Sequence, residues 1–390
     1  MNTSVKGQQE INIGLIGLGA IGKVHAACYS MLQKHFPDYQ IIPHIRTVLE
    51  PFISSNDEIF QTIGNPTLVN DLEDFFNQKY DLVDICTPNF LHKSQVMRAV
   101  EASQNVYCEK PLAKNLEEAI EITRCSLEKK VFSNTSFVYR YLPAFAQMKS
   151  IIAAGGIGEV MNFRAQMVIS SYVNPEQPIS WRLKRAISGG GVLVDLGVHM
   201  IDLARFFFGE ADWVQCETRT FIKQRPQNPK EAELDGLVDV DDWAVCTLGM
   251  QNNAVGVIEV TRVAGGMGRS ANFEVYGREG TLIGNLQEPG NVRFFSRKKN
   301  EWNNGQGNYP DAPGIRPNKQ VWVESDGSLN NLTRLHLASI TDMLLCLRDG
   351  KTPMNNFESA LATQKVMEMA YRSADANGKR ISLKENGDHA

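Results

Sequence analysis

The sequence lacks any apolar run of the ~18–20 residues that a membrane-spanning helix requires. Residues 1–10 are polar and lack the apolar core of a secretory signal peptide. We therefore expect no contact with a membrane and no export of the protein.

An excess of charge of either sign is also absent, because 40 Lys and Arg residues stand against 44 Asp and Glu residues. The basic clusters, such as Lys298–Lys299 and Arg182 to Arg185, are short. Nucleic acids and anionic membranes select long basic tracks. We therefore expect neither as a partner.

Cysteine is scarce, since the chain of 390 residues has seven, an odd number without the paired spacing of zinc or disulfide frameworks. Cys86 and Cys108 lie within the apolar runs LVDIC and VYCEK. This placement is typical of buried, reduced thiols, and it favours the cytoplasm. We expect no metal site, because no ligand set is complete.

The length exceeds what one hydrophobic core usually covers and predicts two domains. Over residues 1–135, apolar runs alternate with helical patterns. We expect strands at residues 11–16, 44–49, 82–86 and 106–108. This alternation predicts an α/β domain of the Rossmann type, with a doubly wound parallel sheet.

Residues 136–390 have a different pattern and predict an α+β domain with an antiparallel sheet. Strands without intervening helices are expected at residues 160–170, 213–221, 243–248, 254–261 and 273–276, and two closing helices at 334–347 and 357–376. Residues 284–331 are rich in Gly, Asn and Pro, which predicts a long loop with a few short strands.

A dinucleotide site is predicted by the pattern G-x-G-x-x-G, which follows the first strand and opens a helix. The first glycine permits a tight turn, the second lets a pyrophosphate approach the backbone, and the third lets helix and strand pack closely. The helix N-terminus then faces the phosphates. The residues concerned are Gly17, Gly19, Ala20, Ile21 and Gly22.

An acid at the end of the second strand favours NAD, because a carboxylate accepts the ribose hydroxyls and repels a 2′-phosphate. Glu50 follows HIRTVL and is our candidate, although it lies further from Gly22 than the usual spacing of about 20 residues. The segment HFPDYQIIP accounts for the excess as an extended helix–strand connection. Were the strand to end at Arg46, NADP would be favoured.

The third strand ends at Thr87-Pro88-Asn89, on the edge of the sheet where ligands bind. Polar groups there are expected to contact the nicotinamide ribose. Pro88 also ends the strand whatever the function.

Three residues are candidates for the chemistry. Lys110 ends the fourth strand before Pro111, which fixes its direction. Asp195 and His199, in a helix after the glycines 189–191, are spaced to share one face. A histidine beside a carboxylate can accept a proton near neutral pH.

At this point the chain resembles the family of glucose–fructose oxidoreductases and inositol dehydrogenases over nearly its full length. The resemblance rests on GLIGLGAIGKVHA, TPNFLH, CEKPLA and GGGVLVDLGVHMIDLARF, in that order. The spacing to Glu50 and the pair Trp181–Arg182 are similar to the levoglucosan-dehydrogenase-like subgroup.

The resemblance implies roles for individual residues. His199 would accept the hydroxyl proton, Lys110 would polarise the oxygen, and Asp195 would orient the substrate. It also implies a large open sheet in the second domain that makes homo-oligomers. Further expected contacts are His92 and Glu109 for the cofactor and Tyr139, Arg140, Trp181 and Arg182 for the substrate, with packing and a surface ion pair as the alternatives for Tyr139 and Arg140.

These features predict an NAD-dependent dehydrogenase that oxidises a secondary hydroxyl of a sugar, cyclitol or glycoside, with NADP left open. The alternatives are a redox-neutral lyase or glycosidase that keeps its NAD, and a non-catalytic sugar sensor. An intact set of Lys110, Asp195 and His199 argues against the sensor. The glutamate at position 50, where the family has aspartate, and the long 284–331 region depart from the family and leave the sugar open.

Overall fold

The computed structural model describes residues 8–53, 58–227, 236–305, 309, 312, 320–325 and 327–384. The chain divides into two compact units. Unit 1 comprises Met1–Ala113, Glu117–Tyr141 and Arg316–Ser359, and unit 2 comprises Lys114–Leu116, Leu142–Ile315 and Ala360–Ala390. Our single boundary after residue 135 therefore differs from this grouping, in which a late segment of the chain completes the N-terminal unit.

Unit 1 contains a six-stranded sheet in the order β3-β2-β1-β4-β5-β6, with every neighbouring pair parallel. The strands are β1 (Gln9–Ile16), β2 (Ile41–Leu49), β3 (Thr67–Val69), β4 (Leu82–Ile85), β5 (Asn105–Cys108) and β6 (Ser133–Thr135). From β1 the chain adds β2 and β3 on one side of the sheet and then β4, β5 and β6 on the other, so the topological switch point lies between β1 and β4. Ligands bind outside the carboxyl ends of the strands at such a point. The predicted doubly wound sheet is confirmed.

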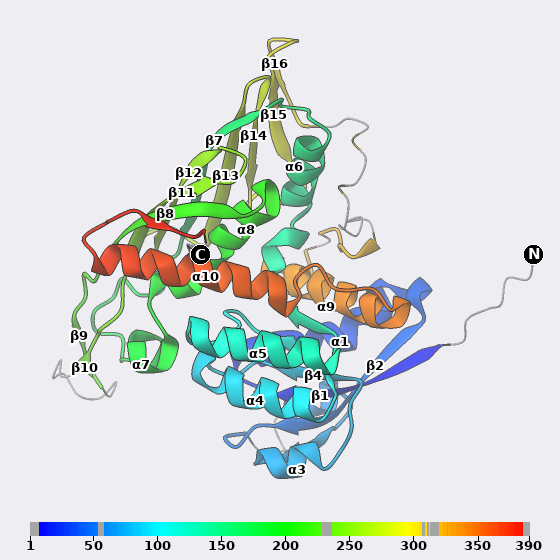
Figure 1. Cartoon of the computed structure of the whole chain (residues 1–390). Helices are drawn as coiled ribbons and strands as arrows, with labels where there is room; N and C mark the ends of the chain where they lie inside the picture. The colour runs from blue at the N-terminus through cyan, green and yellow to red at the C-terminus, as the bar shows by residue number, and fades with distance from the viewer. Residues whose placement is uncertain are drawn as a thin grey trace, which may run out of the picture. The chain divides into compact units, whose positions relative to one another are not determined.

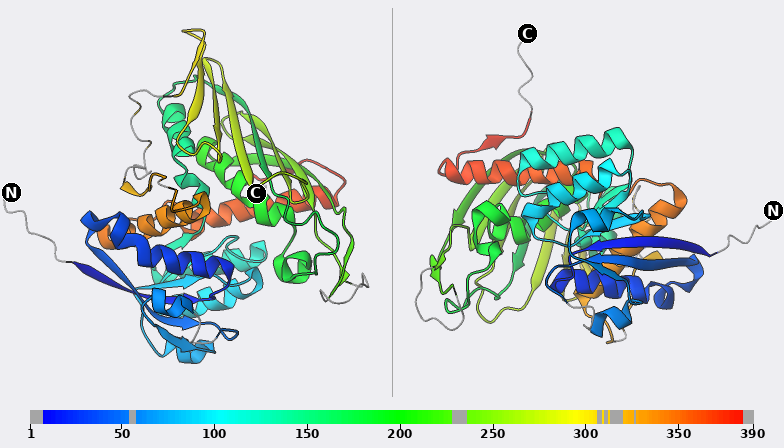
Figure 2. Two further views of the ribbon diagram at one scale, coloured as in Figure 1. Left: turned by 180° about the vertical axis from the view of Figure 1, so that it is seen from behind. Right: turned by 90° about the horizontal axis from the view of Figure 1, so that it is seen from below.

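Helices cover both faces of this sheet (Figures 1 and 2). α4 (Asn89–Glu101) and α5 (Leu116–Lys129) lie on one face, and α1 (Ala20–His35) and α9 (Asn331–Asp349) lie on the other. Shorter helices are η1 (Pro37–Tyr39), α2 (Glu58–Thr62), α3 (Leu72–Phe76) and η2 (Val138–Tyr141). Because α1 and α9 pack together, the late segment buries the helix that follows the glycine pattern.

Unit 2 contains a nine-stranded sheet in the order β16-β15-β14-β13-β7-β12-β11-β8-β17. Its strands are β7 (Val160–Val168), β8 (Ala211–Arg219), β11 (Trp243–Met250), β12 (Val255–Thr261), β13 (Ser270–Gly277), β14 (Gly280–Asn285), β15 (Val292–Ser296), β16 (Glu301–Asn303) and β17 (Ile381–Ser382). Only the described pair β7–β12 is parallel among these neighbours. The mainly antiparallel sheet is confirmed, and β15 and β16 are the short strands expected after residue 284.

One face of the nine-stranded sheet packs against α6 (Pro143–Ala153), α8 (Val198–Phe208) and the π-helical turn η4 (Leu193–Gly197). Aromatic rings fill this core, with Phe163 stacked on Phe273 at 5.7 Å between ring centroids. The opposite face carries exposed apolar side chains such as Val255 and Val257. The remaining elements are η3 (Trp181–Leu183), α7 (Arg185–Ser188), the hairpin of β9 (Gln224–Arg225) and β10 (Gly236–Leu237), and α10 (Phe357–Asp375).

Among the described helices, none combines the length and apolar composition that crossing a bilayer demands. The seven cysteines are free thiols, and all but Cys125 are buried. Their burial agrees with the interpretation of the apolar runs that contain Cys86 and Cys108.

Candidate functional site

The glycine turn between β1 and α1 has the backbone that its pattern predicts. Gly17 has a φ of +91°, which residues other than glycine rarely adopt. A Cβ at Gly22 would lie 2.1 Å from the carbonyl oxygen of Gly17. The first and third glycines are therefore required by turn geometry and by the close approach of helix and strand.

The middle glycine leaves space for a ligand. A Cβ built at Gly19 meets nothing within 4 Å, and Gly19 caps α1 without a side-chain hydrogen bond to the helix end. The first amide groups of a 16-residue helix thus face an open position, which suits a pyrophosphate. The turn fits a dinucleotide.

Glu50 lies at the carboxyl end of β2 and contacts the glycine turn. Its Oε2 accepts a hydrogen bond from the Leu18 amide at 2.9 Å, and its Oε1 accepts one from the Phe52 amide at 3.2 Å. η1 occupies the connection that we expected to lengthen the spacing. β2 continues past Arg46, so the condition for the NADP interpretation is not met.

Thr87, Pro88 and Asn89 form the turn from β4 into α4, at the same edge of the sheet. His92 joins this turn to the next one, because its Nε2 lies 2.9 Å from the carbonyl oxygen of Thr87 and its Nδ1 lies 2.9 Å from that of Pro111. Burial lowers the pKa of His92 against the effect of these two carbonyls. His92 therefore braces two loops of the expected cofactor site.

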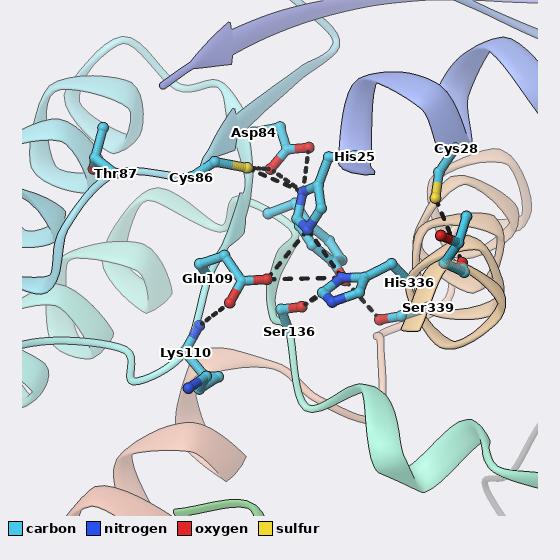
Figure 3. Close-up of polar contacts among 12 residues, drawn as sticks. His25, Cys28, Asp84, Cys86, Thr87, Glu109, Lys110, Ser136, His336 and Ser339 are labelled. Carbon is cyan, nitrogen blue, oxygen red and sulfur yellow. Dashed lines mark hydrogen bonds and ion pairs between the residues drawn. The ribbon is translucent and has the colours of Figure 1, made fainter. Parts of the chain in front are cut away.

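Lys110 follows β5 and is half-buried, next to the buried Glu109 (Figure 3). One oxygen of Glu109, Oε2, accepts a hydrogen bond from the Lys110 amide at 3.1 Å. The other, Oε1, lies 3.2 Å from Nε2 of His25. Glu109 thus connects the turn that carries Lys110 to the interior of unit 1.

His25 occupies the centre of a buried cluster that sequence reasoning missed. Its Nδ1 lies 3.0 Å from Oδ2 of Asp84, and its Nε2 lies 3.0 Å from Nδ1 of His336 on α9. The Tyr29 hydroxyl donates to Asp84 at 2.9 Å. Asp84 is fully buried in the central strand β4, where a carboxylate requires a partner.

The pKa shifts of His25 and Glu109 indicate that this cluster is a network of ions. Burial alone would lower the pKa of His25, but the charge of Asp84 and its hydrogen bond raise that pKa well above the ordinary value. Burial alone would raise the pKa of Glu109, but the hydrogen bond from His25 and the charges of His336, His25 and Lys110 hold it far below the ordinary value. We therefore treat His25 as a cation between two carboxylates.

Two groups of possible metal ligands lie in the same cluster within the described part of the chain. One comprises His25, Asp84 and Cys86, and the other comprises His25, Glu109 and His336. The hydrogen bonds and charges above account for these side chains without a cation. The expectation of no metal stays a prediction.

In unit 2, Asp195 lies in the π-helical turn η4 and His199 in the first turn of α8. The predicted helix after the glycines is present, but the wider π turn at Asp195 was not predicted. Such turns occur often at functional sites. His199 is buried and Asp195 is half-buried.

Asp241 holds the start of this helix and was also missed. Its Oδ1 accepts a hydrogen bond from the Gly191 amide at 2.9 Å, and its Oδ2 accepts one from the Leu193 amide at 2.9 Å. The Tyr371 hydroxyl donates to Oδ1 at 2.8 Å. Because the three groups come from distant segments, no local spacing could have indicated the contact.

The expected substrate residues are divided between the units. Tyr139 and Arg140 are buried in η2 of unit 1, where Arg140 donates to the Met354 carbonyl at 3.0 Å and to the Ser359 hydroxyl at 3.0 Å. These partners differ from the surface acid that we considered.

Trp181 and Arg182 lie in η3 of unit 2, with the guanidinium 4.3 Å from the indole ring centroid. Nearby Tyr172 was not predicted. Burial and the negative charge of Asp195 raise the pKa of Tyr172, against the positive charge of Arg182. This places Tyr172 within electrostatic range of both predicted residues.

Two family models match the chain. One, described as the NAD-binding Rossmann fold of an oxidoreductase family, matches residues 11–135. The other, described as the C-terminal alpha/beta domain of that family, matches residues 149–383. The chain belongs to this oxidoreductase family. The resemblance to glucose–fructose oxidoreductases and inositol dehydrogenases is confirmed, and so is the prediction of an NAD-dependent oxidoreductase acting on CH–OH groups.

Relatives with assigned activities are similar over most of the chain. Levoglucosan dehydrogenase of Pseudarthrobacter phenanthrenivorans is 32% identical over 290 residues, which cover 72% of this chain and 74% of that protein. Myo-inositol 2-dehydrogenase of Thermotoga maritima is 26% identical over 275 residues, covering 70% and 75%.

A solved structure supports the same relationship. Levoglucosan dehydrogenase in complex with NADH and levoglucosan matches with a TM-score of 0.86 and 26% identity, covering 97% of this chain and 100% of that one. The predicted fold and cofactor are thus confirmed, whereas the roles of individual residues stay predictions.

Proposed function

We propose that this protein oxidises a secondary hydroxyl of a cyclic sugar or anhydrosugar, and that Lys110, Asp195 and His199 are its catalytic residues. The observation that carries the proposal is the similarity to levoglucosan dehydrogenase over 97% of the chain. The relative's NADH complex supports the cofactor, and its levoglucosan complex supports the substrate class.

The proposed chemistry assigns one task to each residue. His199 accepts the hydroxyl proton as general base, and Asp195 hydrogen-bonds the substrate and orients it. The Lys110 ammonium stabilises negative charge on the substrate oxygen. NAD, when bound, supplies the acceptor for the hydride that leaves the same carbon.

The cofactor would be held by residues of unit 1. The turn from Gly17 to Gly22, including Ala20 and Ile21, would contact the pyrophosphate, and Glu50 would accept the hydroxyls of the adenosine ribose. Thr87 and Asn89 would contact the nicotinamide ribose. The hydrogen bond from Leu18 to Glu50 supports this assignment, because it holds the carboxylate beside the glycine turn.

A homo-oligomer in the cytoplasm completes the proposal. The open face of the nine-stranded sheet presents the neighbouring apolar side chains of Val255 and Val257, each 40% exposed, and exposed apolar side chains in a cluster are typical of an interaction surface. Charged substitution at Val257, followed by light scattering after gel filtration, tests this face. The buried, reduced thiols suit the cytoplasm.

The decisive experiment follows NADH absorbance with purified protein, NAD or NADP, and a panel of anhydrosugars, monosaccharides, inositols and glycosides. A clear rate with one group supports the proposal and narrows the substrate class. No rate across the panel, together with NAD that survives purification, would instead favour a redox-neutral lyase or glycosidase.

A further inference from the structure

The buried cluster of unit 1 contains ionisable residues to which the proposed function assigns no role. His25, Asp84, Tyr29 and His336 are almost fully enclosed, and none of them belongs to the glycine turn or to the strand-end residues. Burying such groups is costly unless each one is paired. Their contacts converge on Glu109, and through it on the turn that carries Lys110 (Figure 3).

The contacts form one continuous path. Asp84 fixes Nδ1 of His25 at 3.0 Å and so sets the orientation of the ring. The opposite nitrogen, Nε2, meets Oε1 of Glu109 at 3.2 Å. Oε2 of the same carboxylate accepts the amide hydrogen of Lys110 at 3.1 Å. Each step is a charge-assisted hydrogen bond, and the first two steps join buried groups, where such bonds are strengthened.

His336 completes the path from α9. Its Nδ1 lies 3.0 Å from Nε2 of His25, 3.8 Å from Oε1 of Glu109, and 3.5 Å from the Ser136 hydroxyl oxygen. The ring therefore limits how far His25 and Glu109 can move. It lies 311 positions from His25 in the sequence, so this restraint exists only in the folded unit.

We propose that His25, held by Asp84 and His336, is a positioning residue that acts through Glu109 to fix the backbone of Lys110 for catalysis. This inference rests on the proposed role of Lys110. A displacement of about 1 Å at a catalytic group can reduce turnover about 10²-fold. His25, Asp84 and His336 thus affect turnover without themselves touching substrate or cofactor.

Two isosteric substitutions distinguish the contributions of the two ring nitrogens of His25. In His25→Gln the side-chain amide replaces Nε2 and can still donate to Glu109, whereas in His25→Asn it replaces Nδ1 and can donate only to Asp84. We expect kcat to fall about 10²-fold in His25→Asn and much less in His25→Gln, with KM and NAD affinity near wild type in both. Equal loss in the two variants, or wild-type kcat in His25→Asn, would overturn the proposal.

The matched control is Cys28→Ala. Cys28 lies on the same buried face of α1, and its thiol hydrogen-bonds the Thr333 carbonyl of α9 at 3.6 Å and not the Glu109 carboxylate. We expect this variant to keep its turnover. Turnover loss in Cys28→Ala equal to that in His25→Asn would mean that general α1–α9 packing, and not the path to Lys110, controls activity.

A second readout requires no substrate and separates this inference from the proposed function. Competitive acetylation of lysines, quantified by mass spectrometry, compares Lys110 with Lys93, whose side chain is 37% exposed. We expect the relative labelling of Lys110 to change several-fold in His25→Asn and to stay near wild type in His25→Gln and Cys28→Ala. Unchanged labelling in His25→Asn would overturn the inference, even if no sugar is oxidised. A stoichiometric transition metal in the purified protein would also overturn it, because His25, Glu109 and His336 would then be ligands.

Discussion

In unit 1, Glu109, the residue before Lys110, lies at the end of a series of hydrogen bonds between charged groups. In unit 2, by contrast, the helix that carries Asp195 and His199 begins at glycines that pack against Asp241. The first arrangement depends on ionisation, because His25 stands between two carboxylates. The second depends mainly on volume, because a Cβ at Gly191 would lie 2.1 Å from the Asp241 carbonyl oxygen. The fold thus positions the side chains that we propose as catalytic by two different physical means, and a different kind of substitution should disrupt each.

The largest expected effect is the direct loss of a catalytic group. Lys110→Ala and His199→Ala should each reduce kcat by about 10²–10⁴-fold, because proton transfer and charge stabilisation act in the transition state. NAD affinity should change little. Turnover is measured by NADH absorbance and NAD affinity by calorimetry, so that an effect on catalysis is distinguished from an effect on cofactor binding. Lys93→Ala, which removes a half-exposed ion pair with Glu121, is the control. Wild-type turnover in both Lys110→Ala and His199→Ala would refute the assignments.

A steric change should damage the second arrangement. Gly191→Ala forces a methyl group against the backbone of Asp241 and should lower the free energy of unfolding by about 1–3 kcal/mol. Urea denaturation measures this loss. Gly268→Ala in the same unit is the matched control, because a Cβ there meets nothing within 4 Å. Equal stability of the two variants would show that the glycine loop adapts.

Removal of Glu50, the acid that we propose to bind the adenosine ribose, should change cofactor choice in unit 1. Glu50→Ala should reduce the preference for NAD over NADP by about tenfold, the equivalent of one charge-assisted hydrogen bond of about 1.5 kcal/mol. The ratio of kcat/KM for the two cofactors measures the change. Strong preference of the wild type for NADP would contradict the assignment of Glu50.

The smallest expected effect is on the pH dependence of stability. The pKa of buried His25 is raised above 6.5, so its contribution to stability is complete below that pH. The contribution is lost as the pH rises through the raised value. The pKa of Glu109 is lowered, so its contribution is lost as the pH falls below 4.5. Denaturation at a series of pH values should show that His25→Gln removes the alkaline decline, whereas His35→Gln, at the end of the same helix, keeps it.

The sequence was most informative where a local pattern has one structural solution. The glycines at 17, 19 and 22 predicted a turn whose geometry requires glycine at positions 17 and 22, and the apolar runs predicted β1, β4 and β5. The strands β3 and β6 were missed because each has three residues and no apolar run. Pairing with a neighbouring strand, and not local propensity, decides such segments.

The sequence indicated the candidate site residues themselves but not the buried residues that hold them in place. Lys110, Asp195 and His199 lie in recognisable motifs, but their supports come from elsewhere in the chain. Asp241 lies 50 positions from Gly191, and His336 lies 311 positions from His25. No spacing rule connects such pairs, because only the tertiary fold brings them together.

The late position of His336 also has a consequence for biosynthesis. Synthesis proceeds at about 5–20 residues per second, so roughly ten to forty seconds separate the completion of residue 141 from the appearance of α9 on the ribosome. During that interval α1 emerges without the helix that later packs on it, and His25 lacks one of its neighbours. Unit 1 therefore reaches its final packing only after most of unit 2 has been translated.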